Sequence, residues 1–413
     1  MVSPLPPLRT GIADYTIDVA RALVKDHAVD LFHDQDEVAG ALGAPPYRIE
    51  NLPKRHAADP YDAVVYQMGN APAHDFMYEW LERFPGAVVL HDLVLHHSFA
   101  RRFLESPESL AYAADPSNDA NRKAAGNQHD RYVEEIERTH RGLGQRLKDA
   151  HFNTAGDLLP FAFPLFEPAL RHATAVAAHN PFMVEAIRDA RPALPCFEVA
   201  MPAAPIPVPA DTVEALRQSF GLSAAHKVVG CFGLMTREKR VETVARAVAR
   251  IAALHPDIRL LLAGPVSDAA WLLGVLQRSG IKERVMVTGR LSAFEFAAAM
   301  ALADVVVHLR YPTARETSAA LLRVMAQGRP AIISDIANQG EIPDDAVARV
   351  DASDEEGDLA RAIDALLRNP GPARAMGERG RQFILAHHSE VRTRETYARL
   401  LGSQAPGPSP APL

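Results

Sequence analysis

The sequence predicts an α/β protein built from two Rossmann-like domains that face each other across a cleft. Short apolar segments alternate with amphipathic helical segments, a pattern typical of β–α–β units and parallel sheets. The alternation stops at a proline-rich stretch, residues 201–209, and then begins again. A chain of 413 residues is also long for one hydrophobic core, so two domains are expected.

The predicted first domain spans residues 1–203. Gly11 opens its first helix, which is expected over residues 12–23. The apolar strands are expected at residues 29–32, 63–66, 87–90 and 175–178. A polar stretch at about residues 106–153 predicts an insert made of helices, with the clearest helical pattern over 128–151.

The predicted second domain spans residues 204–380. Its strands are expected at residues 228–232, 258–263, 285–288, 305–309 and 331–334. An apolar helix at 319–326 ends before Gly328, the favoured place for a left-handed C-cap. A helical stretch at 381–402 closes the chain, and residues 403–413 have the composition of a disordered proline-rich tail.

Composition excludes several classes of protein. The formal net charge of −7 argues against a nucleic-acid partner held through phosphate contacts. Cys196 and Cys231 are too few for a disulfide framework and lack metal-ligand spacing, which favours a reducing compartment. His96 and His97 are interpreted as chance neighbours in a chain with 17 histidines, so no metal site is expected.

The expected location is the cytoplasm. No apolar run approaches the roughly 20 residues of a membrane span, and no signal segment precedes the first strand. A peripheral contact with the inner membrane face stays open, because the insert carries Arg122, Lys123, Arg131 and Arg141. Acidic residues balance these cations, which favours a soluble helical cover.

The segment Arg315-Glu316-Thr317-Ser318 lies between a predicted strand and a predicted helix. The carboxyl end of a strand and the amino end of a helix form a preferred phosphate site in open α/β sheets. A carboxylate there, Glu316, suits a ligand that has both an anionic part and many hydroxyls, such as a nucleotide sugar. The alternative is a plain helix N-cap, which leaves Glu316 unexplained.

Other candidate residues also follow strands. His91 and Asp92 end the strand at 87–90, and Asn70 and His74 follow the strand at 63–66. Their structural alternatives are a histidine bonded to main chain and ordinary loop capping. Lys239 and Arg240, with Arg237, follow the first strand of the second domain, where cations suit a diphosphate. A solvated charge run is the alternative, and the favoured one for Arg237.

These segments together resemble the retaining GT-B glycosyltransferases of family 4, over nearly the whole chain. The segments are SPLPPLRTGIADYTIDVARAL, VVLHDLVLHH, GLMTREKRVETVARAVARI, LLLAGP, VMVTGRLSAFEFAAAMALADVVVHL and RETS, in that order. Each one alone is weak, and their order and spacing carry the resemblance.

The resemblance implies roles for single residues. Glu316, His91 and Lys239 would be catalytic; Gly11, Lys239, Arg240, Thr317 and Ser318 would bind the donor diphosphate; Gly289, Arg290 and Arg323 would lie near the nucleotide or sugar; and Asn70, His74 and Asp92 would face the acceptor. From the residues alone, Gly11 permits close approach of a diphosphate, and a mere tight turn is its alternative.

The chain departs from the family pattern at two positions. Leu234 stands where relatives commonly carry an arginine, so Lys239 and Arg240 are left to bind the anion. Arg323 stands where relatives carry a second glutamate, which removes carboxylate recognition of the ribose.

The predicted function is transfer of a sugar from a nucleotide-diphosphate sugar to a glycan, lipid-linked glycan or small-molecule acceptor, with retention of configuration. The resemblance implies no metal and no cofactor beyond the donor. Three alternatives stay open: a nucleotide-sugar epimerase, a glycan phosphorylase, and a non-catalytic nucleotide-sugar-binding or scaffold protein. Leu234 and Arg323 are the best support for the last of these.

Overall fold

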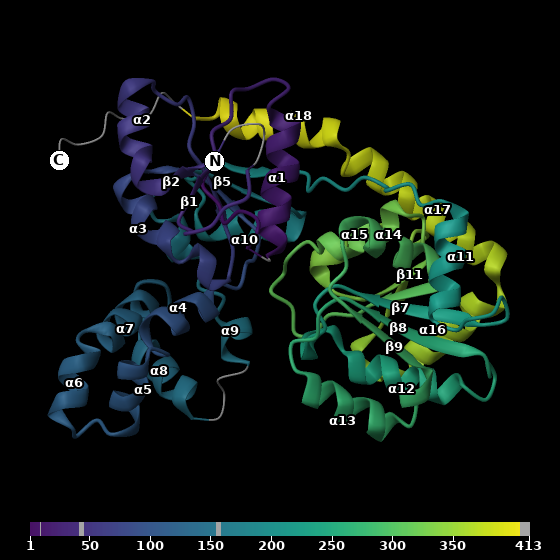
Figure 1. The fold of residues 1–413 in the computed structure, drawn as a ribbon. Helices are drawn as coiled ribbons and strands as arrows, with labels where there is room; N and C mark the ends of the chain where they lie inside the picture. The colour runs from purple at the N-terminus through teal and green to yellow at the C-terminus, as the bar shows by residue number, and fades with distance from the viewer. Residues whose placement is uncertain (9, 41–44, 154–157, 405–413) are drawn as a thin grey trace. The chain divides into compact units, whose positions relative to one another are not determined.

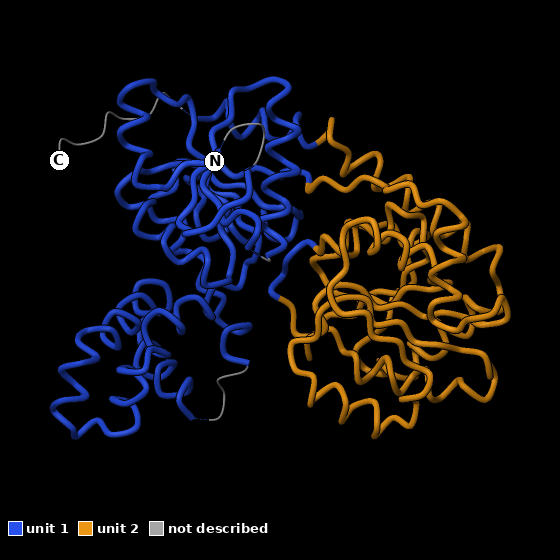
Figure 2. Tube along the Cα trace, viewed as in Figure 1, with its two compact units in different colours: residues 1–200, 314–317, 393–413 blue, residues 201–313, 318–392 orange. Residues whose placement is uncertain are grey.

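The chain forms two compact units in the computed structural model, which describes residues 1–8, 10–40, 45–153 and 158–404. Unit 1 contains Met1–Ala200, Ala314–Thr317 and the chain from Thr393, and unit 2 contains Met201–Thr313 and Ser318–Arg392 (Figure 2). The sequence predicted the boundary at 203/204 but did not predict that two later segments join the first unit.

Unit 1 is built on a parallel sheet with the strand order β3-β4-β5-β6. These strands are β3 (Val65–Met68), β4 (Gly86–Leu90), β5 (Ala173–Ala178) and β6 (Cys196–Glu198). A short parallel pair, β1 (Phe32–His33) and β2 (Tyr47–Arg48), joins it through Val2, which bridges both Phe32 and Tyr66. The β3 and β4 strands are buried along their whole length, as expected for strands covered on both faces.

Helices of unit 1 cover this sheet (Figure 1). They are α1 (Gly11–Leu23), α2 (Leu52–Ala58), α3 (Phe76–Arg83) and α10 (Pro181–Ala190). Thr10 caps α1 by accepting the N–H of Ala13, so the helix begins one residue earlier than predicted. Asn180 caps α10 in the same way, through the N–H of Met183.

The helical insert is longer than the predicted 106–153. It comprises α4 (His96–Phe103), α5 (Pro107–Ala114), α6 (Asp119–Ala125), α7 (Gln128–Thr139), α8 (Gly144–Phe152) and α9 (Leu159–Ala162). Its own apolar cluster is centred on Tyr132 and Ile136. The predicted helical stretch at 128–151 contains two helices, α7 and α8: Gly142 has φ +79° between them, and the Glu137 carboxylate accepts the N–H groups of Gly142 and Gly144.

Unit 2 contains a six-stranded parallel sheet with the order β12-β11-β10-β7-β8-β9. The strands are β7 (Lys227–Phe232), β8 (Ile258–Ala263), β9 (Val285–Gly289), β10 (Val305–His308), β11 (Ala331–Ser334) and β12 (Ala348–Val350). The first five agree with the predicted strands to within one residue. The short strands β2, β6 and β12 were not predicted, because three residues or fewer show no periodicity.

The helices of unit 2 are α11 (Ala210–Ser219), α12 (Val241–Ile251), α13 (Ala269–Ser279), α14 (Ala293–Leu302), α15 (Ala319–Ala326), α16 (Glu355–Arg368) and α17 (Pro370–His387). The predicted closing stretch at 381–402 is two helices, α17 and α18 (Glu390–Gly402). The first of these helices ends with His388 as its C-cap. The main-chain oxygen of His388 accepts the N–H of Ala203, and its ring Nδ1 bonds Met201 O. The predicted tail lies, from residue 405, outside the described residues.

No helix in the described part of the chain is both long and apolar enough to cross a membrane.

The core of unit 2 predicts a measurable stability effect. Leu260 lies fully buried in β8, in the centre of the apolar cluster of unit 2. Leu260→Ala should therefore lower the free energy of unfolding of unit 2 by about 3 kcal/mol, through lost transfer energy and a residual cavity. Urea unfolding followed by Trp271 fluorescence in a Trp80→Phe background measures this, since the chain has two tryptophans.

Leu254→Ala is the matched control, because that side chain is 59% exposed. Equal effects of the two substitutions would contradict the assigned core.

Candidate active site

Two adjacent parallel strands of unit 1, β3 and β4, end at the same edge of their sheet. Gly69 and Asn70 follow β3, and His91 and Asp92 follow β4. The N–H of Asn70 donates to Asp92 Oδ2 at 3.0 Å, and Asn70 Oδ1 accepts the N–H of Ser98 at 3.0 Å. The structure thus brings Asn70, His91 and Asp92 together at the carboxyl edge, where open parallel sheets bind ligands.

The ring of His91 is buried, and both of its nitrogens have partners. Its Nε2 lies 2.9 Å from the Gln67 side-chain amide, and its Nδ1 lies 3.2 Å from His179 Nε2. Burial lowers the pKa of His91 well below its usual value, and the neighbouring His179 and His74 act in the same direction. The imidazole is therefore neutral, and a ligand would reach its ring nitrogens only by displacing one of these contacts.

His74 is also fully buried, but it offers a lone pair. Its Nδ1 donates to the main-chain oxygen of Gln67 at 2.9 Å, whereas its Nε2 has no hydrogen-bond partner among the described residues. Burial lowers the pKa of His74 to about 4. A Cβ at Gly69 would lie 2.2 Å from Ile12 Cδ1, 3.2 Å from His74 Nε2 and 3.4 Å from Asp92 Oδ2. The missing side chain of Gly69 therefore lets Ile12, His74 and Asp92 pack close to the main chain.

Gly11 is the first residue of α1 and is exposed. A Cβ built there would meet nothing within 4 Å. The fold itself therefore does not require glycine at this position, and the open space is compatible with the predicted approach of a ligand.

The segment Ala314–Thr317, which carries Glu316, is part of unit 1 rather than of the predicted second domain. The N–H groups of Leu93 and Val94 donate to Ala314 O at 3.0 and 3.3 Å. The amide nitrogen of Asn180 donates to Arg315 O and Thr317 Oγ1, at 3.1 and 3.0 Å. Arg315 adopts φ +64° and its guanidinium stacks over Phe182, 4.8 Å from the ring centroid.

Lys239 is a buried cation at the carboxyl edge of the unit 2 sheet. It follows β7 in a short 3₁₀ turn, η4 (Arg237–Lys239), and is 8% exposed. Its Nζ donates to Phe232 O, the last carbonyl of β7. Gly233 has φ +98°, and a Cβ there would lie 2.8 Å from Lys239 Nζ. The glycine is thus needed both for its backbone conformation and for the close approach of the ammonium group.

Arg240 and Arg237 have acidic partners. Arg240 Nε lies 2.7 Å from Glu355 Oε2, a carboxylate that also accepts from Thr243. Arg237 pairs with Asp268 at 3.7 Å and lies over Trp271. The charge of Arg240 is therefore largely balanced within unit 2.

The helix after the RETS segment, α15, begins where it was predicted to begin. Ser318 is its N-cap, and the Ser318 hydroxyl accepts the N–H of Leu321 at 3.4 Å. Thr317, as described above, accepts the Asn180 amide instead of capping the helix. Arg323 is half-buried in the second turn of α15.

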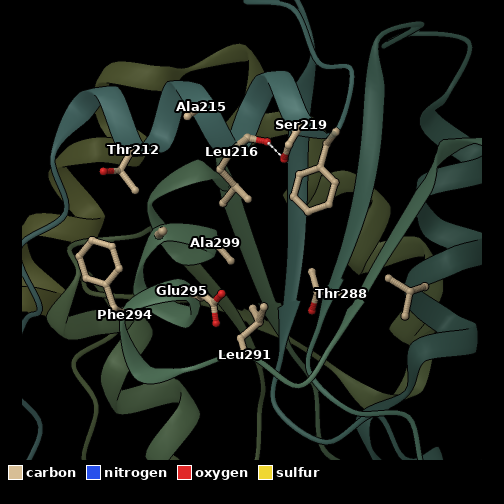
Figure 3. Close-up of a pocket in the computed structure, with 12 residues that line it drawn as sticks. Thr212, Ala215, Leu216, Ser219, Thr288, Leu291, Phe294, Glu295 and Ala299 are labelled. Atoms are coloured by element: carbon tan, nitrogen blue, oxygen red, sulfur yellow. Dashed lines mark hydrogen bonds between the residues drawn. The ribbon is translucent and has the colours of Figure 1, made fainter.

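Gly289 and Arg290 adjoin a cavity of about 500 Å³ in unit 2. Gly289 ends β9 with φ +68°, and the flanking residues Thr288 and Leu291 line the cavity (Figure 3). Most of its lining is apolar: Ala215, Leu216, Phe220, Val287, Leu291, Phe294, Ala298 and Ala299, with Thr212, Ser219, Thr288 and Glu295 as the polar members. The loop predicted to face the nucleotide therefore borders a space of ligand size.

The structure gives His96 an internal role. Its Nδ1 bonds Phe163 O at 2.7 Å and its Nε2 bonds Tyr132 OH at 2.5 Å, inside the helical insert. Within the described residues, no group of three or more His, Cys, Asp and Glu side chains is arranged to bind a metal ion.

The sequence analysis did not identify several residues that lie at these two sheet edges. His179 and Asn180 follow β5, which pairs with β4, so the strand-end pattern that pointed to His91 and Asp92 could have found them. His308, the last residue of β10, is buried, and its Nε2 has no hydrogen-bond partner among the residues that the structure describes. Burial, Lys239 and Arg310 together lower its pKa well below the usual value. Gln67 and Tyr397 gave no signal at the level of the sequence.

Residues 226–369 match the family described as Glycosyl transferases group 1. A curated relative, 2-deoxystreptamine glucosyltransferase from Streptomyces kanamyceticus, is 26% identical over 201 residues, which is 46% of this chain. The match spans about half of that relative, 51% of its length. Lys239, Gly289, Arg290, Glu316 and Arg323 all lie within the family match.

Solved glycosyltransferase structures resemble nearly the whole chain. HepE from Anabaena, crystallised with UDP-glucose, has a TM-score of 0.64 at 16% identity and covers 97% of this chain and 98% of its own. Sucrose-phosphate synthase from Thermosynechococcus elongatus has a TM-score of 0.60 at 19% identity, with 95% and 94% covered. WaaG, a glycosyltransferase of lipopolysaccharide biosynthesis, has a TM-score of 0.60 at 13% identity, with 98% and 100% covered. The predicted fold class is confirmed: an α/β protein of two Rossmann-like domains in the GT-B architecture.

The buried imidazole of His74 predicts a pH dependence. Its pKa is about 4 in the folded chain, and the ordinary value of about 6.5 applies when the chain is unfolded. The unfolded state therefore binds the proton first as the pH falls, and folding stability is lost below about pH 6.5. As the pH falls from about 7 to about 5, this residue should lower the free energy of unfolding of unit 1 by about 2 kcal/mol.

His74→Gln, which can still donate to Gln67 O, should remove that part of the pH dependence. Urea unfolding at both pH values, followed by Trp80 fluorescence in a Trp271→Phe background, measures the difference. The same pH slope in both proteins would show that His74 is not the neutral buried group described above.

Proposed function

We propose that this chain transfers a glycosyl group from a nucleotide-diphosphate sugar to an acceptor hydroxyl, with retention of configuration and without a metal or cofactor. The observation that carries the proposal is Lys239, a cation buried beside Gly233 at the carboxyl end of β7. This position lies within the residues that match the group 1 family and suits an anionic leaving group.

In the proposed reaction, unit 2 binds the donor diphosphate. Lys239 stabilises the negative charge that develops on the diphosphate as the bond to the sugar breaks. The N–H groups at the start of α15, at Ser318, add partial positive charge from the helix end. Gly289 and Arg290 contact the nucleotide, and Arg323 takes the place of the carboxylate that relatives use at the ribose.

Unit 1 binds the hydroxyl-bearing parts of the substrates in the same proposal. Glu316 accepts hydrogen bonds from hydroxyls of the transferred sugar. Asn180 holds the residues on both sides of Glu316, by donating to the main-chain oxygen of Arg315 and to the hydroxyl of Thr317. His91 and Gly11 border this site. Asn70, His74 and Asp92 face the acceptor, and His74 Nε2 and the Asp92 carboxylate are hydrogen-bond acceptors suited to hydroxyl donors. No side chain is assigned as general base, and the leaving phosphate is proposed to take the acceptor proton.

The relatives suggest the first substrates to try. HepE was crystallised with UDP-glucose, and the curated relative is named for glucosyl transfer to 2-deoxystreptamine. UDP-glucose is therefore the proposed first donor. Hydroxyl-rich small molecules and glycans, with lipid-linked glycans beside them, are the proposed acceptor classes.

A non-catalytic sugar-binding protein is the second candidate, and Leu234 is the observation that favours it. Leu234 is 49% exposed where the resembled family carries an arginine, so no cation replaces that group at the same position.

A donor panel tests the proposal directly. UDP-, GDP-, ADP-, dTDP- and CDP-sugars are added to the purified protein, and the melting temperature is recorded. A ligand that binds the folded state raises the melting temperature by mass action. We expect a rise with one base, UDP first, and loss of that rise in Lys239→Met, which keeps the aliphatic stem. Lys282→Met, in the exposed 3₁₀ turn before β9, is the matched control.

Glu316 decides between the two candidates. Glu316→Ala should lower turnover about a hundredfold or more, because the hydrogen bonds that orient the sugar are lost. Nucleoside diphosphate release with a responsive acceptor is the measurement, with Glu283→Ala as an exposed control. Near-normal turnover by Glu316→Ala would show that Glu316 does not bind the sugar. If the unmodified protein binds a donor but transfers no sugar, the non-catalytic candidate is favoured.

A further inference from the structure

A continuous chain of buried polar groups runs through unit 1 beside the candidate site. Its members are Tyr15 in α1, Tyr397 in α18, Gln67 in β3, His91 after β4, His179 after β5 and the main-chain oxygen of Val199. The hydroxyls of Tyr15 and Tyr397 are 2.5 Å apart, and Tyr397 OH is 3.4 Å from the Gln67 amide. His91 and His179 continue the chain, and His179 Nδ1 lies 3.0 Å from Val199 O.

Counting protons from the Val199 end fixes the direction of these hydrogen bonds. A carbonyl oxygen only accepts, so the proton of His179 must be on Nδ1. With His179 taken as neutral, its Nε2 carries a lone pair, and His91 must donate to it from Nδ1. His91 in turn has a lone pair on Nε2, and this atom needs a donor from Gln67.

In the structure, Gln67 Oε1 faces His91 Nε2 and Gln67 Nε2 faces Tyr397 OH. Exchanging the two ends of the amide turns its nitrogen toward His91 and meets that need. The oxygen and nitrogen ends of an amide have nearly the same size, so hydrogen-bond counting decides which end faces His91. With the oxygen facing His91 Nε2, two lone pairs would oppose each other between the histidines unless an extra proton made one of them an imidazolium. His91 is fully buried, and the nearby His179 and His74 disfavour a positive charge there.

We propose that Gln67 is a positioning residue that donates its amide N–H to His91 Nε2 and accepts the His74 Nδ1 proton on its main-chain oxygen. One residue thereby sets the tautomers of both histidines at the carboxyl edge of the sheet. The amide oxygen accepts from Tyr397, whose oxygen accepts from Tyr15. With the neutral His179 that the proposal assumes, this places the proton of each hydrogen bond described above and leaves both imidazoles uncharged.

The consequence for the site rests on the proposed function. With both tautomers fixed, His74 Nε2 presents a lone pair beside Asp92, and the wall that faces the acceptor stays free of positive imidazole charge at neutral pH. Loss of this control should change turnover more than donor affinity, because Gln67 contacts neither the diphosphate nor its cation, Lys239.

The first experiment reads the tautomers without any substrate. The protein is labelled at histidine nitrogens, and long-range proton–nitrogen NMR spectra are recorded near neutral pH. His91→Gln, His179→Gln and His74→Gln assign the signals. We expect a proton on Nδ1 and none on Nε2 in all three rings. A proton on His91 Nε2, or an imidazolium signal from His91 or His179, would overturn the proposal.

The second experiment exchanges the amide for a carboxylate of the same shape. In Gln67→Glu, the carboxylate must accept from His91 Nε2 and favours the imidazolium, so the apparent pKa of His91 should rise by at least about one unit. The acid limb of the kcat profile should move to higher pH by a similar amount, with KM for the donor nearly unchanged. Gln67→Met, which offers neither end, should not raise the His91 pKa.

Gln277→Glu makes the same charge change on the exposed face of α13 and should leave both readouts unchanged. Melting temperatures check that each variant folds. If Gln67→Glu raises the His91 pKa but leaves the kcat profile in place, the positioning role is wrong. If no donor supports transfer in the unmodified protein, the proposed function fails, while the NMR result still decides the direction of the hydrogen bonds.

Discussion

The parallel register of β3, β4 and β5 is the constraint on which the candidate site of unit 1 depends. Parallel strands all end at the same edge, so three separate chain segments deliver their first loop residues there: Gly69-Asn70, His91-Asp92 and His179-Asn180. A slip of one residue in any of these pairings would turn the side chains to the other face and separate them. The buried β-branched residues of β4 and the alanines of β5 prevent that slip by filling the sheet interior.

Both units also bury polar side chains near the carboxyl edge of their sheet. In unit 1 the buried groups are imidazoles and hydroxyls that hydrogen-bond to one another. In unit 2 the buried group is the Lys239 cation, which has a carbonyl partner and an adjacent neutral imidazole, His308. A positive charge at this edge is suited electrostatically to a negatively charged ligand.

The sequence predicted what depends on local pattern. Apolar runs located the unit 2 strands, and strand-end residues pointed to Asn70, His91, Asp92 and Lys239. The sequence could not predict contacts between distant positions. Tyr397 meets Gln67 across 330 residues, and Arg240 meets Glu355 across 115, so the binding role expected of Arg240 gave no sign of its internal partner. The unit to which Glu316 belongs was missed for the same reason, since Asn180 supplies the decisive contacts.

The predicted helical stretches at 128–151 and 381–402 are interrupted by contacts that can be seen only in the three-dimensional structure. The Glu137 carboxylate stabilises the turn between α7 and α8 by accepting the N–H groups of Gly142 and Gly144. A glutamate within a helical pattern does not predict such a turn. His388 interrupts the closing helical stretch through its bond to Met201, a residue of the proline-rich segment.

Unit 1 is assembled from the beginning, a middle segment and the last helix of the chain. During synthesis, the ribosome must release α18 before Tyr397 can reach Tyr15, whereas the residues of unit 2 have all been made by then. Unit 1 therefore begins to be synthesised first but can complete its folding only last. Until α18 has been released, Tyr15 and Gln67 lack their contact with Tyr397.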